Sequence, residues 1–109
     1  MPYENPMLEK LLIALDDIQA VDVVVIDVRE HTSITDYMVI ASGRASRHVR
    51  AIAETVMVDM KKAGLPSLSA TGLETGDWAV VDFGDIVLHL MQAESRQYYN
   101  LEGLWNNVN

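Results

Sequence analysis

The apolar residues of this chain recur at helical spacing in three segments, which are separated by strand-like runs. The first helix is predicted to follow Asn5 and Pro6, because a capping asparagine followed by proline is a typical helix start. A second helix is predicted after Gly43 and ends at Gly64, where glycine suits the C-terminal cap. The same spacing predicts a third helix over residues 93–105.

Runs rich in β-branched residues lie between these segments and predict strands. Residues 23–28 and 36–42 are apolar on both faces, which is typical of buried strands. Residues 65–70 alternate and contain a proline, so they predict an edge strand. Residues 77–91 predict a hairpin that turns at Phe83 and Gly84.

The resulting order, αββαβββα, predicts the fold class. Strands that are apolar on both faces need cover on both sides, and three helices can supply it. We therefore expect a three-layer α/β domain with one mixed sheet of about five strands and helices on both faces. The chain has 109 residues, of which 50% are hydrophobic, and it shows no linker or repeat. This predicts a single domain over residues 1–109.

The charge balance narrows the class of partner. The chain carries 16 acidic and 8 basic residues, for a formal net charge of -8. This argues against a general nucleic-acid binder and suits a basic protein partner, although solubility alone would also explain it. The chain has no cysteine, no signal-peptide pattern and no apolar run long enough to cross a bilayer. A cytoplasmic protein without membrane contact is the simplest prediction.

A basic cluster near the start of the second helix needs compensation, because cations there oppose the helix dipole. It consists of Arg44, Arg47, His48 and Arg50. We expect the chain's own carboxylates to neutralise it and to leave Arg44 freest. The candidate partners are Asp36, Glu54, Asp82 and Asp85. Arg44 and Arg47 remain candidates for an anion contact or a peripheral contact with RNA.

Enzymatic chemistry finds little support in the sequence. The Ser42-Gly43 turn could hold a phosphate, but nucleotidyl transfer needs two alternating carboxylates on a following strand, and none occurs. Asp82-Phe83-Gly84 is interpreted as a turn, and His89 as a structural histidine hydrogen-bonded within the sheet. His31 has no second ligand at metal-site spacing. We predict no catalytic residue, metal or cofactor, and keep a nucleotide-binding or nucleotidyltransferase enzyme as the alternative.

Aromatic residues mark a candidate interaction surface. Trp78 begins a strand beside a glycine-containing turn, and Tyr98, Tyr99 and Trp105 lie in the predicted last helix. Aromatic anchors are typical interface hot spots. Core packing is the alternative for each of them.

Six motifs, in their order and spacing over residues 7–105, resemble the ribosomal silencing factor family, also called the Iojap family. The motifs are Asp27-Val28-Arg29, Ile34-Thr35-Asp36-Tyr37, Ser46-Arg47-His48-Val49-Arg50, Asp77-Trp78, Val81-Asp82-Phe83-Gly84-Asp85-Ile86-Val87-Leu88-His89 and Leu101-Glu102-Gly103-Leu104-Trp105. The chain departs from the family at Arg44-Ala45, where hydroxyl residues are usual.

The resemblance implies a nucleotidyltransferase-like fold without the catalytic carboxylates. It implies binding to the large ribosomal subunit through ribosomal protein fourteen, which blocks joining of the small subunit and lowers translation when nutrients are scarce. It also implies self-association, so the same apolar patch could serve a homodimer. The residues predicted to bind the partner are Asp77, Trp78, Tyr98, Tyr99, Leu101, Leu104 and Trp105.

Overall fold

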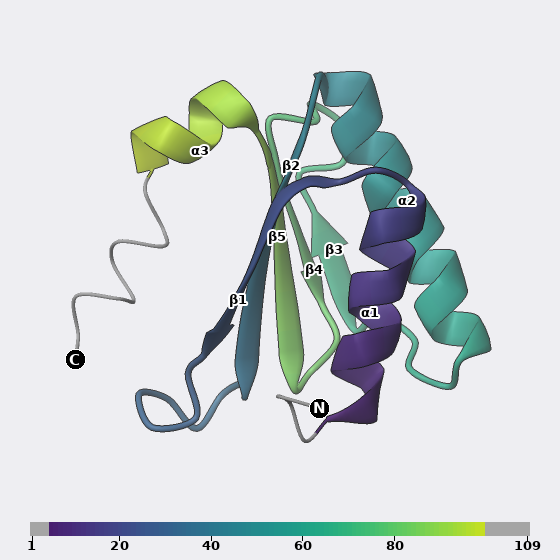
Figure 1. The fold of residues 1–109 in the computed structure, drawn as a ribbon, viewed down its shortest axis with the longest axis vertical. Coiled ribbons are helices and arrows are strands. Elements are labelled where there is room, and N and C mark those ends of the chain that lie inside the picture. Colours follow the sequence, from purple (N-terminus) through teal and green to yellow (C-terminus); the bar gives the residue numbers. More distant parts are fainter. Residues whose placement is uncertain (1–4, 100–109) are drawn as a thin grey trace.

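A computed structural model describes residues 5–99, and the order of its elements is the predicted αββαβββα (Figure 1). In chain order the elements are α1 (Pro6–Asp17), β1 (Val21–Asp27), β2 (Tyr37–Gly43), α2 (Ser46–Lys62), β3 (Ser69–Thr71), β4 (Trp78–Asp82), β5 (Ile86–Gln92) and α3 (Ala93–Tyr99). No helix in this part of the chain is long and apolar enough to cross a membrane.

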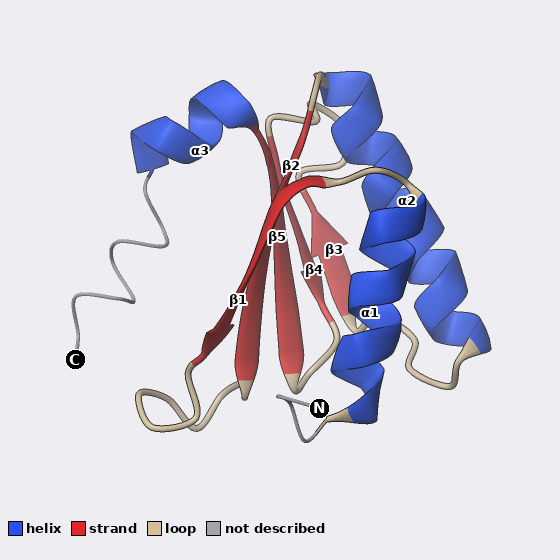
Figure 2. Cartoon of the chain, in the orientation of Figure 1, coloured by secondary structure: helices blue, strands red, loops and turns tan. Residues whose placement is uncertain are grey.

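The five strands form one mixed sheet in the order β1-β2-β5-β4-β3 (Figure 2). β2 and β5 are parallel, and the other neighbouring pairs are antiparallel. β2 lies inside the sheet and is buried along its whole length, as its apolar sequence predicts. β4 and β5 form the predicted hairpin, in which the Gly84 N–H donates to Asp82 Oδ1 at 2.7 Å. The mixed five-stranded sheet is thus confirmed.

The residues predicted to mark helix ends are confirmed at Asn5, Pro6 and Gly64. The Asn5 side chain caps α1 by accepting the Met7 N–H at 2.9 Å, and Pro6 is the first helical residue. α2 ends at Lys62, just before Gly64, whose φ of 98° is a backbone conformation that glycine adopts without strain. α2 begins after Ala45, which offers no side-chain cap.

The helices cover the two faces of the sheet unequally. α1 and α2 pack together on one face, and the main core lies between them and the strands (Figure 1). α3 lies on the opposite side, hereafter the α3 face, and contacts β2 and β5. A smaller cluster belongs to the α3 face, and its buried members are Ile26, Val28, Met38, Ile40 and Met91. Helices on both faces are therefore confirmed.

Two strand predictions are wrong in detail. β1 was expected to be buried, but it is an edge strand, and Val23 is 36% exposed. A run of valines does not reveal whether a strand has one neighbour or two, so the pattern overestimates burial here. The strand predicted over 65–70 is shorter and later, because β3 covers only Ser69–Thr71. The third helix is confirmed to Tyr99, and its predicted remainder over 100–105 lies outside the described residues.

Candidate partner-binding face

Trp78 is the first residue of β4, and its half-buried side chain packs against the cluster on the α3 face. Its indole Nε1–H donates a hydrogen bond to Nδ1 of His89 at 3.0 Å. The two ring centroids are 5.9 Å apart, and the ring planes are tilted by 45°. Trp78 therefore lies at the boundary between core and surface, with an apolar ring that is partly accessible and a polar atom that is already paired.

His89 lies in β5, opposite Ile40 of β2 and Val80 of β4. Burial lowers its pKa from the ordinary value of 6.5, because desolvation disfavours the charged ring. An Nδ1 that accepts a hydrogen bond carries no proton, so the neutral ring has its proton on Nε2. The prediction of a histidine hydrogen-bonded within the sheet is confirmed. Its partner, the indole of Trp78, was not predicted.

The turn before Trp78 is held by its neighbours on both sides. The Gln92 side chain donates to Asp77 Oδ1 at 3.0 Å, and Arg50 Nη1 donates to the Glu74 carbonyl at 3.1 Å. Gly76 has a φ of 69°, and a Cβ there would lie 2.5 Å from the Ser46 carbonyl oxygen. The turn therefore packs closely against the start of α2. This packing fixes where β4, and with it Trp78, begins.

Arg96 anchors α3 to the sheet, and sequence analysis missed it. Its side chain is only 8% exposed. Nη1 donates to Ser42 Oγ at 3.1 Å and to the Val21 carbonyl at 3.5 Å, so it reaches both β2 and β1. An arginine in a polar helix segment gives no sequence signal of burial. Only the fold brings it over a serine in a buried strand.

The other predicted partner-binding residues are described less fully. Asp77 lies in the turn beside Trp78, and its carboxylate is exposed. Tyr98 and Tyr99 belong to α3, but their side chains are outside the described part of the structure. Leu101, Leu104 and Trp105 lie outside the described residues. Of the predicted set, the structure thus brings Asp77, Trp78 and the backbone of the two tyrosines to one end of the sheet.

The basic cluster at the start of α2 has different partners from those predicted. His48 accepts the Arg44 N–H at Nδ1 (2.9 Å), and its Nε2 contacts the Ile18 carbonyl at 3.0 Å. Arg44 Nη2 donates to Gln19 Oε1 at 3.3 Å, and Arg50 donates to a backbone carbonyl. The expected carboxylate partners are wrong for these two arginines, because their side-chain hydrogen bonds within the described residues end on neutral oxygens.

The topology of the sheet explains why Asp36 and Asp85 do not pair with the basic cluster. α2 follows the C-terminal end of β2, whereas Asp36 and Asp85 lie at its other end, where Tyr37 is opposite Ile86. A strand of seven residues separates the two groups by about 20 Å. Arg44 was also expected to be freest, but it is bonded to Gln19. In the described part of the chain no carboxylate pairs with Arg47, which is exposed.

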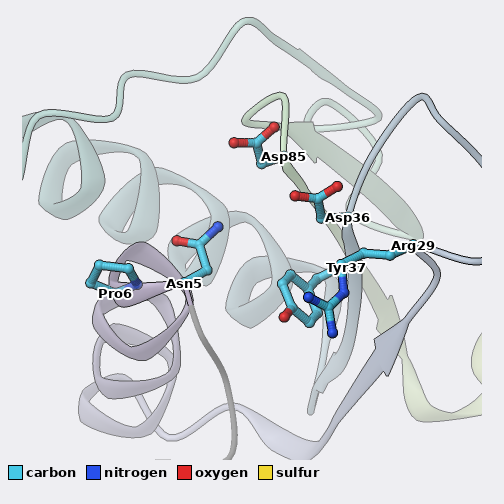
Figure 3. Close-up of a pocket in the computed structure, with 6 residues that line it drawn as sticks. All are labelled: Asn5, Pro6, Arg29, Asp36, Tyr37 and Asp85. Atoms are coloured by element: carbon cyan, nitrogen blue, oxygen red, sulfur yellow. The ribbon is translucent and has the colours of Figure 1, made fainter.

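An open pocket of about 360 Å³ lies at that other end of the sheet (Figure 3). It is lined by Asn5, Pro6, Arg29, Asp36, Tyr37 and Asp85. The Arg29 guanidinium lies 5.4 Å from the centre of the Tyr37 ring and pairs with Asp27 at 2.7 Å. Hydrogen bonds from Arg29 lower the pKa of the exposed Asp27 carboxyl.

The pocket has a structural explanation in the loops that meet there. The Asp85 carbonyl accepts the N–H groups of both Asp36 and Tyr37, which joins the start of β2 to the β4–β5 turn. Three of the quoted motifs therefore converge here, at Arg29, Asp36 and Asp85. Among the described residues, no three His, Cys, Asp or Glu side chains gather in a group that could hold a metal ion.

An α/β domain that sets a half-buried tryptophan in a partly covered sheet face is suited to binding another macromolecule. The family to which this chain belongs is the one described as "Ribosomal silencing factor during starvation", whose model matches residues 2–109. The resemblance inferred from the six motifs is thereby confirmed.

Named relatives and solved structures agree with this family. A Haemophilus influenzae protein named ribosomal silencing factor RsfS is 42% identical over 99 residues, covering 91% of this chain and 97% of that protein. A mouse protein named mitochondrial assembly of ribosomal large subunit protein 1 is 37% identical over 101 residues, covering 90% of this chain and 44% of its own. A crystal structure of a Chromobacterium violaceum protein matches with a TM-score of 0.89 at 37% identity, covering 92% of this chain and 83% of that one. The nucleotidyltransferase likeness stays a prediction.

Proposed function

We propose that this chain binds the large ribosomal subunit through ribosomal protein fourteen and thereby blocks joining of the small subunit, which lowers translation when nutrients are scarce. The observation that carries the proposal is the half-buried Trp78 on the α3 face of a chain that belongs to the ribosomal silencing factor family. The mechanism is steric and needs no cofactor. A folded domain occupies a surface that the small subunit requires, and it acts in the cytoplasm.

The charge of the chain supports a basic protein as the direct partner. A formal net charge of -8 creates a negative field that attracts a basic surface and repels exposed phosphate. Asp77, which precedes Trp78 in the chain, adds an exposed carboxylate to this turn, and its Oδ1 accepts a hydrogen bond from the Gln92 side chain. An aromatic anchor surrounded by polar groups is the usual composition of an interface hot spot.

Two further contacts belong to this proposal. Arg47 is exposed on α2, and the Arg44 side chain donates to the neutral side chain of Gln19, so we include both in a peripheral contact with ribosomal RNA. A second copy of the chain could bind through the same α3 face. In that case the homodimer and the ribosomal complex would compete for Trp78, and dilution would favour ribosome binding.

Replacing Trp78 with alanine tests the proposal. At an interface hot spot, Trp78→Ala should weaken binding to purified large ribosomal subunits by about 2 kcal/mol or more. The same change in a full core would instead cost about 3–5 kcal/mol in folding. The variant's affinity and its free energy of unfolding should be measured together. Lost stability with unchanged affinity of the folded fraction would contradict the assignment of Trp78 to the interface.

A further inference from the structure

Trp78 and His89 are held together across neighbouring strands. β4 and β5 are antiparallel, with Trp78 opposite Met91 and Val80 opposite His89, so the two rings are diagonal neighbours on the α3 face. Diagonal positions on a sheet are close enough for long aromatic side chains to interact. The hydrogen bond from the indole N–H to Nδ1, at 3.0 Å, joins them directly.

The chemistry of the two rings makes this contact directional. An indole has one N–H donor and no acceptor, so a half-buried tryptophan needs an acceptor at a defined place. His89 supplies it only while Nδ1 is unprotonated, and burial favours that neutral form. The bond therefore selects one orientation of the indole among those that its two side-chain torsions permit.

We propose that His89 is a positioning residue for partner binding: by accepting the Trp78 N–H it holds the indole in the orientation that the partner's surface requires. This inference rests on the proposed function, because it assumes that Trp78 touches the partner. His89 itself need not touch the partner. Its effect is to remove, before binding, a torsional freedom that would otherwise be lost on binding.

The surroundings of His89 are mainly apolar. Ile40 in β2 and Val80 in β4 flank it, and the pKa of its ring is lowered by burial, with no contribution from a charged group among the described residues. Among the residues whose side chains are described, β4 carries Asp82 on this face, whose carboxylate accepts the Gly84 N–H. The helix α3 carries the exposed Glu94 and the buried Arg96, which is bonded to Ser42. Protonation of His89 would remove the acceptor and release the indole.

Two substitutions separate positioning from a purely structural role. In His89→Asn the side-chain oxygen stands close to where Nδ1 stood and can accept the indole N–H. His89→Val offers no acceptor, yet valine is the better strand former of the two. We therefore expect His89→Asn to bind large subunits more tightly than His89→Val, although His89→Val should be the more stable of the two. This order makes His89→Asn the matched control for His89→Val.

The measurements are affinity for purified large ribosomal subunits and hydrogen exchange of the Trp78 indole N–H. We expect His89→Val to weaken binding by about three- to tenfold and to speed indole exchange, while His89→Asn stays close to the unsubstituted chain. In a Trp78→Phe background, which lacks the N–H, adding His89→Val should cost no further affinity. Because burial lowers the pKa of His89 below 6.5, binding of the unsubstituted chain should weaken only as the pH falls towards that lower folded-state pKa, and that of His89→Asn should not.

Equal affinity of His89→Val and the unsubstituted chain would overturn this inference and leave the proposed function standing. The same holds if the effect of His89→Val persists in full in the Trp78→Phe background. If the unsubstituted chain fails to bind large subunits at all, the proposed function fails and this inference fails with it. The exchange rate, measured without ribosomes, reports the hydrogen bond separately in either case.

Discussion

The guanidinium of Arg96 in α3 donates to the hydroxyl of Ser42 in β2 at 3.1 Å, in a region where both side chains are buried. This contact joins the last described helix to an interior strand of the sheet. A charged group can stay buried only when hydrogen bonds replace its water. The docking of α3 over one end of the sheet therefore depends on a polar contact as well as on apolar packing.

Arg96→Ala should consequently destabilise the domain. It removes the donor to Ser42 and to the Val21 carbonyl, and we expect the free energy of unfolding to fall by about 1–3 kcal/mol in urea denaturation. Arg29→Ala is the matched control, because Arg29 pairs with Asp27 at an exposed site and should cost less than about 1 kcal/mol. A smaller loss for Arg96→Ala than for Arg29→Ala would contradict the anchoring role.

Acidification should reduce stability through His89. The folded-state pKa is lowered from 6.5, so as the pH falls below 6.5 the unfolded chain binds a proton that the folded chain does not. The stabilisation is complete above 6.5 and is lost as the pH falls towards the folded-state pKa. The free energy of unfolding should be measured between about pH 8 and about pH 5 for the unsubstituted chain and for His89→Asn. If both chains lost stability equally, other groups would account for the effect.

Gly76→Ala should be much more damaging than Gly64→Ala, although both positions have positive φ. A Cβ at Gly76 would lie 2.5 Å from the Ser46 carbonyl oxygen, whereas a Cβ at Gly64 meets nothing within 4 Å. We expect the second change to cost about 1 kcal/mol and the first distinctly more. Melting temperatures would check this. Similar losses at the two sites would show that the turn before Trp78 is not packed against α2.

Arg47→Ala tests the peripheral RNA contact. In the described part of the chain Arg47 has no carboxylate partner, so its loss should leave the melting temperature unchanged. If Arg47 meets a phosphate, the slope of log affinity against log salt should fall by about one unit. Lys61→Ala, in the last turn of α2, is the control and should leave the slope unchanged. An unaltered slope for Arg47→Ala would remove the RNA contact from the account.

The sequence predicts the fold well because each element carries its own local signal. The Asn5-Pro6 start of α1, the apolar run of β2 and the Gly84 turn depend on neighbours within a few residues. The edge position of β1 is not local information, because it depends on the strand order. The pattern of valines is the same whether a strand has one neighbour or two, and so the exposure of Val23 was missed.

The candidate site was predicted less completely for the same reason. Trp78 can be singled out from the sequence because it is a large aromatic residue at the start of a strand. The glycine-containing turn before it is compatible with a place near the surface. Its hydrogen bond to His89 spans eleven positions and follows from the register of β4 and β5. The predicted carboxylate partners of the basic cluster were wrong because the sequence does not reveal which end of the sheet each carboxylate occupies. The topology places Asp36 and Asp85 at the opposite end of β2.

Sedimentation of the purified chain with ribosomal particles tests directly whether it binds the large subunit and excludes the small one. The chain should be mixed with large subunits alone, with small subunits alone and with joined ribosomes, and the fractions assayed for it. We expect recovery with free large subunits only, and fewer joined ribosomes when the chain is added before the small subunit. Comparable recovery with joined ribosomes would contradict the steric mechanism, because the chain and the small subunit would then occupy the large subunit together.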